Sequence, residues 1–325
     1  MNCTLLALDG CPLSSVSGPL EILSLANSLV PREGRMSIHI VGETQQVNCL
    51  GAVQLTAHGT LNDLTHTDLL IIGAIGHPAG RSEQFDPMTL AWIQRQYAQG
   101  AVVVSICSGA FVLAATGLLD GKRATTHWAT EGLFRQRYPK VKLQSEQMIT
   151  QDGNLYCSGG ASAYQDMSLL LVREYFGLEV ARQVAKRVLI DMDRHSQQVY
   201  AQFMPERQHQ DSTIHSLQDW LKGHARESVS IEALALRSHL SERQLKRRFK
   251  QATGLSPLSY IQGLRIEAAK HALQTSNQQV EAVARAVGYE DVRFFRQLFK
   301  RLTGLSPSEY RSKFLLPART ANGMG

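Results

Sequence analysis

The sequence has few features of a secreted or membrane-spanning protein. Its 325 residues include only five cysteines, an odd number with no C-x-x-C spacing, so neither a disulfide framework nor a zinc site is indicated. The start, Met1 to Thr4, lacks the basic residues of a signal peptide. The longest apolar run, roughly residues 110–119, is too short to cross a bilayer. We therefore expect a cytoplasmic protein without membrane contact, bound metal or cofactor.

Charge is scarce and unevenly placed. Charged residues make up 19% of the chain against 43% hydrophobic residues, a globular composition, and the length favours two domains. Residues 213–325 hold 18 Lys and Arg against 9 Asp and Glu, a net of +9, whereas residues 1–212 hold 16 against 19, a net of −3. This asymmetry suggests that the front domain binds something small and that the back domain binds a polyanion.

The front half alternates apolar runs with helical periodicity. Four runs rich in Leu, Ile and Val predict buried parallel strands: 4–8, 37–41, 68–72 and 101–106. Helices are predicted at 19–29 and 87–99, each with a proline near its first turn, and then at 161–176 and 179–190. This alternation predicts an α/β domain with an open, mostly parallel, flavodoxin-like sheet over residues 1–190.

Strand-like and helical patterns both fail between residues 191 and 213, a segment rich in Gln, His and Arg that we interpret as a linker. From residue 214 to 316 only short helical segments separated by turn signals follow, so an all-α domain is predicted there, with residues 317–325 as a tail. The boundary between the two domains is therefore placed in the linker.

A repeat dominates the back third. Residues 249–260, FKQATGLSPLSY, recur at an offset of 50 residues as 299–310, FKRLTGLSPSEY. In each copy a short helix, a tight turn and a second helix closed by glycine can be recognised, over 231–254 and 280–304. This is the helix-turn-helix arrangement, whose second helix enters the DNA major groove.

Helical spacing predicts which side of each second helix faces solvent. Leu245 and Phe249 should point inward in the first copy, and Val292, Phe295, Phe299 and Leu302 in the second. The opposite faces are rich in Arg, Gln and Lys, side chains that bind base edges or phosphates. The residues expected to bind DNA are Ser241, Arg243, Gln244, Lys246, Arg247, Lys250, Arg293, Arg296, Gln297 and Lys300.

From Ile214 to Phe314 the chain resembles the AraC/XylS family of bacterial regulators, most closely over residues 287–311. The resemblance implies a long helix near 257–274 joining two units that read successive major grooves, with double-stranded DNA and RNA polymerase as partners. The sequence departs from the family pattern at His239, where glycine is frequent, and at Arg293 and Gln297, where Ser and Arg are frequent. These departures affect which bases are read.

In the front domain, residues 103–110 run from a strand directly into a helix around Cys107, with small residues on both sides. Such a turn is typical of a nucleophile elbow, and a helix N-terminus favours a thiolate. His127 is a candidate partner base, and the alternative interpretation is a core histidine beside Trp128. We assign no catalytic residue and regard Cys107 and His127 as vestigial candidates only.

The first 190 or so residues resemble the ThiJ/PfpI, or class I glutamine-amidotransferase-like, superfamily, through residues 18–21, 69–74 and 105–128. Joined to an AraC-type module, this resembles the GlxA-like subgroup of regulators. Ser108 follows Cys107, and Ser15 stands where related chains often carry Asp, so an obvious catalytic acid is lacking. The expected ligand-binding residues at the carboxyl ends of the strands are Asp9, Ser15, Gly73, Ala74, Gly76, Cys107, Ser108 and His127.

The sequence therefore favours a ligand-responsive, sequence-specific DNA-binding transcription regulator. The resemblance implies an activator of a metabolic operon that senses a small, nitrogen-containing metabolite and forms a homodimer through its front domain. Two other interpretations stay open. One is a cysteine-dependent amidase or hydrolase with an accessory DNA-binding module, and the other is a redox sensor acting through Cys107.

Overall fold

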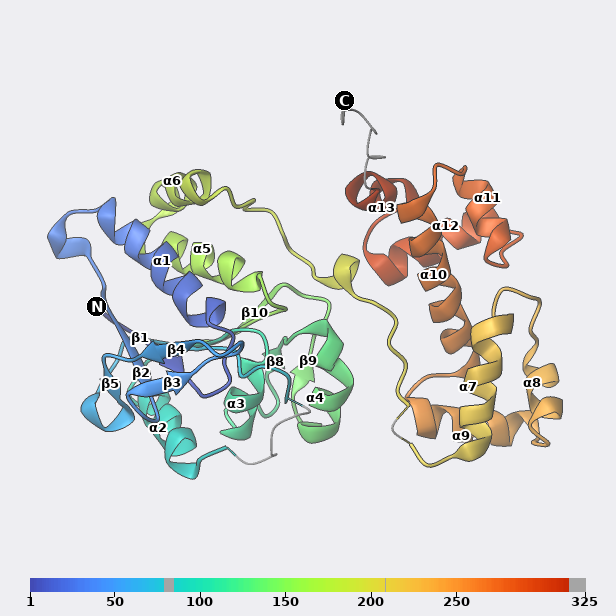
Figure 1. The fold of residues 1–325 in the computed structure, drawn as a ribbon, viewed down its shortest axis with the longest axis horizontal. Helices are drawn as coiled ribbons and strands as arrows, with labels where there is room; N and C mark the ends of the chain where they lie inside the picture. The colour runs from blue at the N-terminus through green and yellow to red at the C-terminus, as the bar shows by residue number, and fades with distance from the viewer. Residues whose placement is uncertain (79–84, 208, 316–325) are drawn as a thin grey trace. The chain divides into compact units, whose positions relative to one another are not determined.

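The computed structural model describes residues 1–78, 85–207 and 209–315, and the predicted tail at 317–325 lies outside them (Figure 1). The chain divides into two compact units, Met1–Gln197 and Gln198–Gly325. This division falls inside the segment expected to be a linker. Within the described residues, no helix is long and apolar enough to cross a membrane.

The front unit is built on a seven-stranded sheet in the order β10-β11-β7-β6-β1-β2-β5. Every neighbouring pair is parallel except β10 and β11, which form an antiparallel edge. The predicted open, mostly parallel sheet is confirmed, and its four central strands lie where the apolar runs placed them. The strands are β1 (Asn2–Ala7), β2 (Ser37–Gly42), β5 (Gly59–Thr60), β6 (Leu69–Ile72), β7 (Val102–Ser105), β10 (Ile149–Asp152) and β11 (Leu155–Ser158).

Helices cover both faces of this sheet (Figure 1). One hydrophobic cluster joins one sheet face to α1 (Ser14–Ser28), α5 (Ala163–Phe176) and α6 (Leu178–Val188). A second cluster joins the other face to α2 (Pro87–Ala98), α3 (Gly109–Ala115) and α4 (Glu131–Arg137). Because both faces are buried, the strands must be apolar throughout, which is why they were recognisable in the sequence. Two small sheets pair β3 (Gln46–Asn48) with β4 (Gln54–Thr56), and β8 (Arg123–Ala124) with β9 (Lys142–Leu143).

Helix α1 starts five residues before the predicted Pro19, so the prediction of a start at that proline was wrong. The first turn is wound by backbone hydrogen bonds from the Ser15 N–H to Pro12 and from the Ser17 N–H to Leu13. Pro19 therefore lies inside the helix, where its missing N–H removes one bond without ending it.

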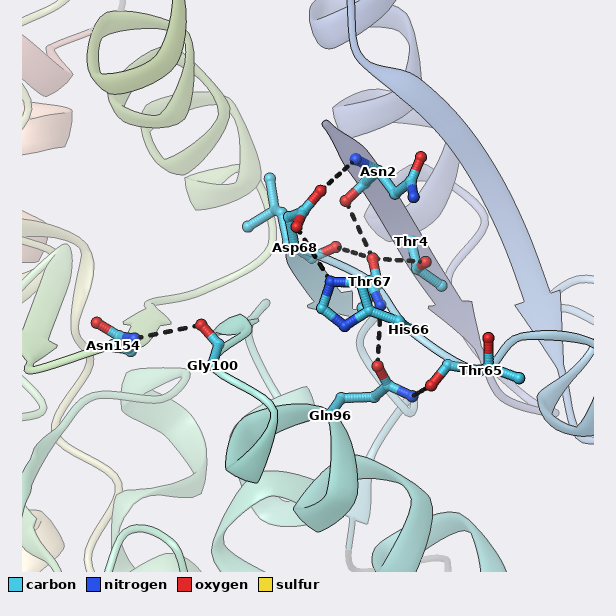
Figure 2. Close-up of polar contacts among 10 residues, drawn as sticks. Asn2, Thr4, Thr65, His66, Thr67, Asp68, Gln96, Gly100 and Asn154 are labelled. Atoms are coloured by element: carbon cyan, nitrogen blue, oxygen red, sulfur yellow. Dashed lines mark hydrogen bonds and ion pairs between the residues drawn. The ribbon is translucent and has the colours of Figure 1, made fainter.

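The amino ends of the central strands are held by a partly buried polar network (Figure 2). The Asp68 carboxylate accepts a hydrogen bond from the Asn2 N–H at 2.7 Å, and the Thr67 hydroxyl accepts one from the Thr4 hydroxyl at 2.9 Å. Gln96 of α2 accepts from the Thr67 N–H at 3.0 Å. Since these groups satisfy one another, this edge is structural, and the carboxyl edge is left for a binding site.

The back unit is all helical, as predicted. Its helices are α7 (Ser212–His224), α8 (Ile231–Arg237), α9 (Glu242–Thr253), α10 (Pro257–Thr275), α11 (Val280–Ala286), α12 (Val292–Thr303) and α13 (Pro307–Phe314). One hydrophobic cluster lies around α7, α8 and α9, and another around α11, α12 and α13, with α10 contributing to both. The repeat in the sequence therefore corresponds to two helical bundles that share one long helix.

Candidate DNA-reading helices and effector pocket

The first helix-turn-helix unit consists of α8, a turn at Ser238–Leu240, and α9. The turn requires a left-handed residue, which is His239 with φ of +54°. Helix α9 begins with a capping box, in which the Ser241 hydroxyl accepts from the Gln244 N–H and the Gln244 side chain accepts from the Ser241 N–H. Ser241 and Gln244, two residues expected to bind DNA, thus also fix the start of the helix.

Leu245 and Phe249 of α9 are fully buried, as predicted. Arg243, Lys246, Arg247 and Lys250 are exposed on the other side. Lys246 forms an ion pair with Glu242 one turn earlier, at 2.7 Å. Within the described residues, the side chains of Arg243, Arg247 and Lys250 make no hydrogen bond or ion pair, so they are available to a polyanion.

The second unit repeats this plan with α11 and α12, and Gly288 supplies the left-handed residue of the turn with φ of +92°. Phe295 and Phe299 are buried as predicted, but Leu302 is 38% exposed, so its assignment to the inward face was wrong. The last turn buries Thr303 instead, whose hydroxyl donates to the Phe299 carbonyl at 2.8 Å. Leu298, which the sequence analysis did not select, is buried in the core.

The exposed face of α12 carries Arg293, Arg296, Gln297 and Lys300. Arg296 is tied to Glu281 of α11 at 2.6 Å. In the described part of the chain, the other three side chains have no hydrogen-bond or ion-pair partner. Each unit thus presents two long polar side chains suited to base edges (Arg243 with Arg247, and Arg293 with Gln297), together with one unengaged lysine.

Arg265, in the middle of α10, joins the two helix-turn-helix units. Its guanidinium donates to the carbonyls of Ala225 at 2.6 Å and Glu227 at 2.7 Å, beside the first unit. It also donates to the carbonyl of Gly288 at 2.9 Å, in the turn of the second unit. A planar fork of donors that reaches three carbonyls fixes the spacing of the two units. Its partners lie 23 to 40 residues away in the sequence, so no local pattern could have revealed this role.

In the front unit, Cys107 occupies the expected strand-to-helix elbow with φ of +54°. Its N–H donates to Ser158 of β11 at 3.2 Å, and its carbonyl accepts from the Thr126 hydroxyl at 3.1 Å. Burial raises the pKa of the Cys107 thiol, although the backbone N–H groups of Ser108 and Ala161 act in the opposite direction. Desolvation of Cys107 thus acts against the thiolate that a helix N-terminus is expected to favour.

Two serines position the loop after β6, which carries Gly73, Ala74 and Gly76. The Ser15 hydroxyl accepts from the Ala74 N–H at 3.0 Å, and the Ser108 hydroxyl accepts from the Ile75 N–H at 3.0 Å. Any side chain at Gly73 would crowd this contact, since its β-carbon would lie 3.0 Å from Val16 and 3.3 Å from the Ser15 hydroxyl. Five of the expected ligand-binding residues therefore meet here: Ser15, Gly73, Ala74, Cys107 and Ser108.

The side chains of His127 and Asp9 accept hydrogen bonds from backbone N–H groups. His127 Nδ1 accepts from the Ala129 N–H at 3.0 Å, and burial lowers the pKa of its ring, with a smaller contribution from His77. No hydrogen bond joins Cys107 to His127, both of which are among the described residues. The Asp9 carboxylate accepts from the Asn48 N–H at 2.9 Å. This arrangement brings polar groups to the carboxyl edge of the sheet without an assembled nucleophile, base and acid among the described residues.

Gln197, the last residue of the front unit, was missed by the sequence analysis. Only 2% of it is exposed, and its side-chain oxygen accepts from the Gly160 N–H at 3.0 Å and the Trp128 N–H at 3.3 Å. Its amide group donates to the Thr126 carbonyl at 2.7 Å. Gln197 thus holds both segments beside His127, because the Gly160 backbone lies against the histidine ring.

These features define a class of protein: a double helix-turn-helix unit joined to an α/β domain that gathers polar groups around Cys107 at the carboxyl edge of its sheet. Residues 5–174 match the DJ-1/PfpI family, and residues 234–313 match the family described as Helix-turn-helix domain. The chain belongs to the DJ-1/PfpI family, and it is a regulator of the AraC type that carries this domain in front of its helix-turn-helix region.

Individual relatives agree with this assignment. The HTH-type transcriptional regulator GbdR of Pseudomonas aeruginosa is 26% identical over 94% of this chain and 83% of its own length. The HTH-type transcriptional regulator GlxA of Rhizobium meliloti is 27% identical over 66% of each chain. An isonitrile hydratase of Pseudomonas putida is 33% identical, over 52% of this chain and 69% of its own length. Named regulators thus match both units, whereas this enzyme covers about half of the chain.

Among solved structures, a candidate transcriptional regulator protein of Vibrio parahaemolyticus matches with a TM-score of 0.52 and 30% identity. The match covers 58% of this chain and 100% of the other. The α/β fold of the front unit therefore has an experimental counterpart.

Proposed function

We propose that this protein is a cytoplasmic, ligand-responsive transcription factor that activates a metabolic operon together with RNA polymerase. A small, nitrogen-containing metabolite binds at the carboxyl edge of the front sheet, and two copies pair through their front units. DNA is read by α9 and α12, with Arg243, Arg247, Arg293 and Gln297 contacting base edges while Lys250 and Lys300 contact phosphates.

The observation that carries this proposal is the pair of exposed polar faces at corresponding positions of the two units, each with three side chains that have no hydrogen-bond or ion-pair partner among the described residues. In each unit the opposite face of the same helix is buried in the core, so the polar face must point toward solvent. The residues differ between the units, so one chain should recognise an asymmetric site that spans two major grooves.

The test starts with selection of duplexes from a random library by the full-length protein. Arg243→Ala and Arg293→Ala should each weaken binding to the selected duplex by about 1–3 kcal/mol and relax the base preference in one half of the site only. Lys250→Ala should weaken all duplexes alike and reduce the salt dependence. Arg187→Ala, which removes an exposed charge from α6, is the matched control. Enrichment of no sequence, or equal loss with the control, overturns the proposal.

The second candidate function is a cysteine-dependent hydrolase, which the elbow at Cys107 and the likeness to the isonitrile hydratase favour. Cys107→Ala separates the two. A sensor has no turnover to lose, and the variant should shift only the ligand concentration that changes DNA binding.

A thermal-shift screen of the full chain against amino acids and quaternary amines identifies the ligand, because a ligand that binds only the folded state raises its stability.

A further inference from the structure

Two cysteines that lie far apart in the sequence meet beside the candidate pocket. The sulfur atoms of Cys11, which follows β1, and Cys49, which follows β3, are 3.6 Å apart, and the residues are separated by 38 positions. A disulfide bond is about 2.0 Å long, so the two atoms would have to approach by about 1.5 Å. Rotation of the two side chains is the smallest movement that could bring this about.

The backbone already holds the two cysteines side by side. The Gly10 N–H donates to the Asn48 carbonyl at 2.6 Å, and the Leu50 N–H donates to the Cys11 carbonyl at 2.8 Å. The Asp9 carboxylate adds a bond from the Asn48 N–H at 2.9 Å. These bonds flank the sulfur pair on both sides, so the pairing of the segments does not depend on the sulfurs themselves.

Access to the pair is through Cys49. Cys11 is fully buried, while Cys49 is 7% exposed and lies directly before a turn with exposed Leu50 and Val53. That turn contains Ala52 with φ of +60°, a conformation that residues other than glycine adopt at a cost. A short, exposed and strained turn can open locally without unfolding the unit. An oxidant would therefore meet Cys49 first and Cys11 second.

Burial disfavours the thiolate form of three other cysteines, of which Cys107 is more exposed to solvent than Cys49. Burial raises the pKa of Cys3 to about 12, and it also raises the pKa values of Cys107 and Cys157. A raised pKa lowers the fraction of reactive thiolate.

We propose that Cys11 and Cys49 form a redox-active pair that hydroperoxides convert into an intrachain disulfide. The Cys49 thiolate attacks a peroxide oxygen, the O–O bond breaks, and a sulfenic acid and one water (or alcohol) result. The Cys11 thiol then attacks the sulfenyl sulfur, the S–O bond breaks, and water leaves as the S–S bond forms. Two thiols lose two electrons and two protons in total, and the peroxide is reduced.

The disulfide would act on the candidate pocket through the segment after β1. Pro12 accepts a hydrogen bond from the Ser15 hydroxyl at 2.7 Å, and that same hydroxyl holds Ala74. The Gly10 carbonyl lies 2.9 Å from where a β-carbon on Gly76 would stand. Locking Cys11 to the β3–β4 hairpin therefore fixes one wall of the pocket.

The test treats the full-length protein with hydrogen peroxide, blocks remaining thiols with N-ethylmaleimide, and identifies tryptic peptides without reduction by mass spectrometry. Peptide 36–81 contains only Cys49, whereas peptide 1–32 contains both Cys3 and Cys11. The linked pair of peptides should form in the wild type, persist in Cys3→Ser and Cys107→Ser, and vanish in Cys11→Ser. Dithiothreitol should reverse it.

Fragmentation of the linked wild-type peptides shows whether Cys3 or Cys11 carries the bond to Cys49, so the proposal is decided even if a serine variant fails to fold. Alkylated Cys49 in peroxide-treated wild-type protein, or a link that persists in Cys11→Ser, overturns it. A link from Cys49 to a different cysteine does the same. Because DNA plays no part in this measurement, its outcome is independent of the proposed regulatory function.

Discussion

The side-chain oxygen of Gln197 accepts a hydrogen bond from the N–H of Gly160 at 3.0 Å, so the last residue of the front unit is bonded to the backbone that packs on His127. Gln197 is followed directly by the back unit, in which Gln198 donates to the Arg301 carbonyl at 2.8 Å. The chain is therefore anchored on both sides of the boundary.

Gln197→Ala should lower the free energy of unfolding of the front unit by about 1–3 kcal/mol, because the buried N–H groups of Gly160 and Trp128 would lose their acceptor. Chemical denaturation followed by tryptophan fluorescence measures this. The control is Gln198→Ala, which removes a single hydrogen bond from a less buried residue. Equal losses in the two variants would show that the Gln197 network is not the anchor.

Arg265→Lys should show whether Arg265 acts through the geometry of its guanidinium, which fixes the spacing of the two units, or through its positive charge alone. A lysine keeps the positive charge but cannot donate to three carbonyls in the geometry of the guanidinium, so the two helix-turn-helix units should lose their fixed spacing. Affinity for a selected duplex that carries both half-sites should fall about tenfold, equivalent to about 1.4 kcal/mol. Fluorescence anisotropy measures it, and Arg285→Lys on α11 is the matched exchange. An unchanged affinity would contradict the assigned role.

The parts of the molecule that local rules determine could be predicted from the sequence. Helix α9 is closed by a glycine as predicted, since Gly254 ends it with φ of +73°, and Ser241 caps its start. The buried strands were recognisable because a covered sheet demands apolar residues on both faces. Helix α1 was placed too late because Pro19 signals a helix start more often than a helix interior.

Residues whose role depends on distant partners could not be predicted. Gln197 bonds to groups 37 to 72 positions away, and polar residues in a segment without periodicity gave no sign of burial. The roles of Arg265 and of the Cys11 and Cys49 pair also depend on partners that are distant in the sequence. The exposed reading faces were visible because each is the complement of a local amphipathic pattern. The interactions that fix the spacing of these faces could not be recognised in the sequence.

The two turns of the helix-turn-helix units should respond in opposite ways to substitution. His239 adopts φ of +54°, which costs a non-glycine residue about 1–2 kcal/mol, so His239→Gly should stabilise the back unit by up to about 1 kcal/mol after the loss of chain entropy. Gly288→Ala should destabilise it by more, since the new β-carbon would lie 2.4 Å from the Arg226 carbonyl oxygen. Thermal unfolding followed by circular dichroism measures both changes. A destabilising His239→Gly would mean that the imidazole makes a contribution larger than the strain.

The ion pair between Asp211 and Arg248 should make the back unit sensitive to acid. Both guanidinium nitrogens of Arg248 that face Asp211 donate to its carboxylate, at 2.9 and 2.7 Å, and this lowers the pKa of Asp211 below its ordinary value of 3.8. A carboxyl group whose pKa is lower in the folded state stabilises the fold fully above the ordinary value, and the contribution is lost as the pH falls through the folded-state pKa.

Asp211→Asn keeps an oxygen that can cap α7 at Ile214 but removes the charge. The variant should therefore be less stable than the wild type at neutral pH, and the difference should shrink as the pH falls below 3.8. Urea denaturation at a series of pH values measures this, with the exposed Glu290→Gln as the control. A difference that stays constant down to the acid limb would mean that Asp211 acts only as a helix cap.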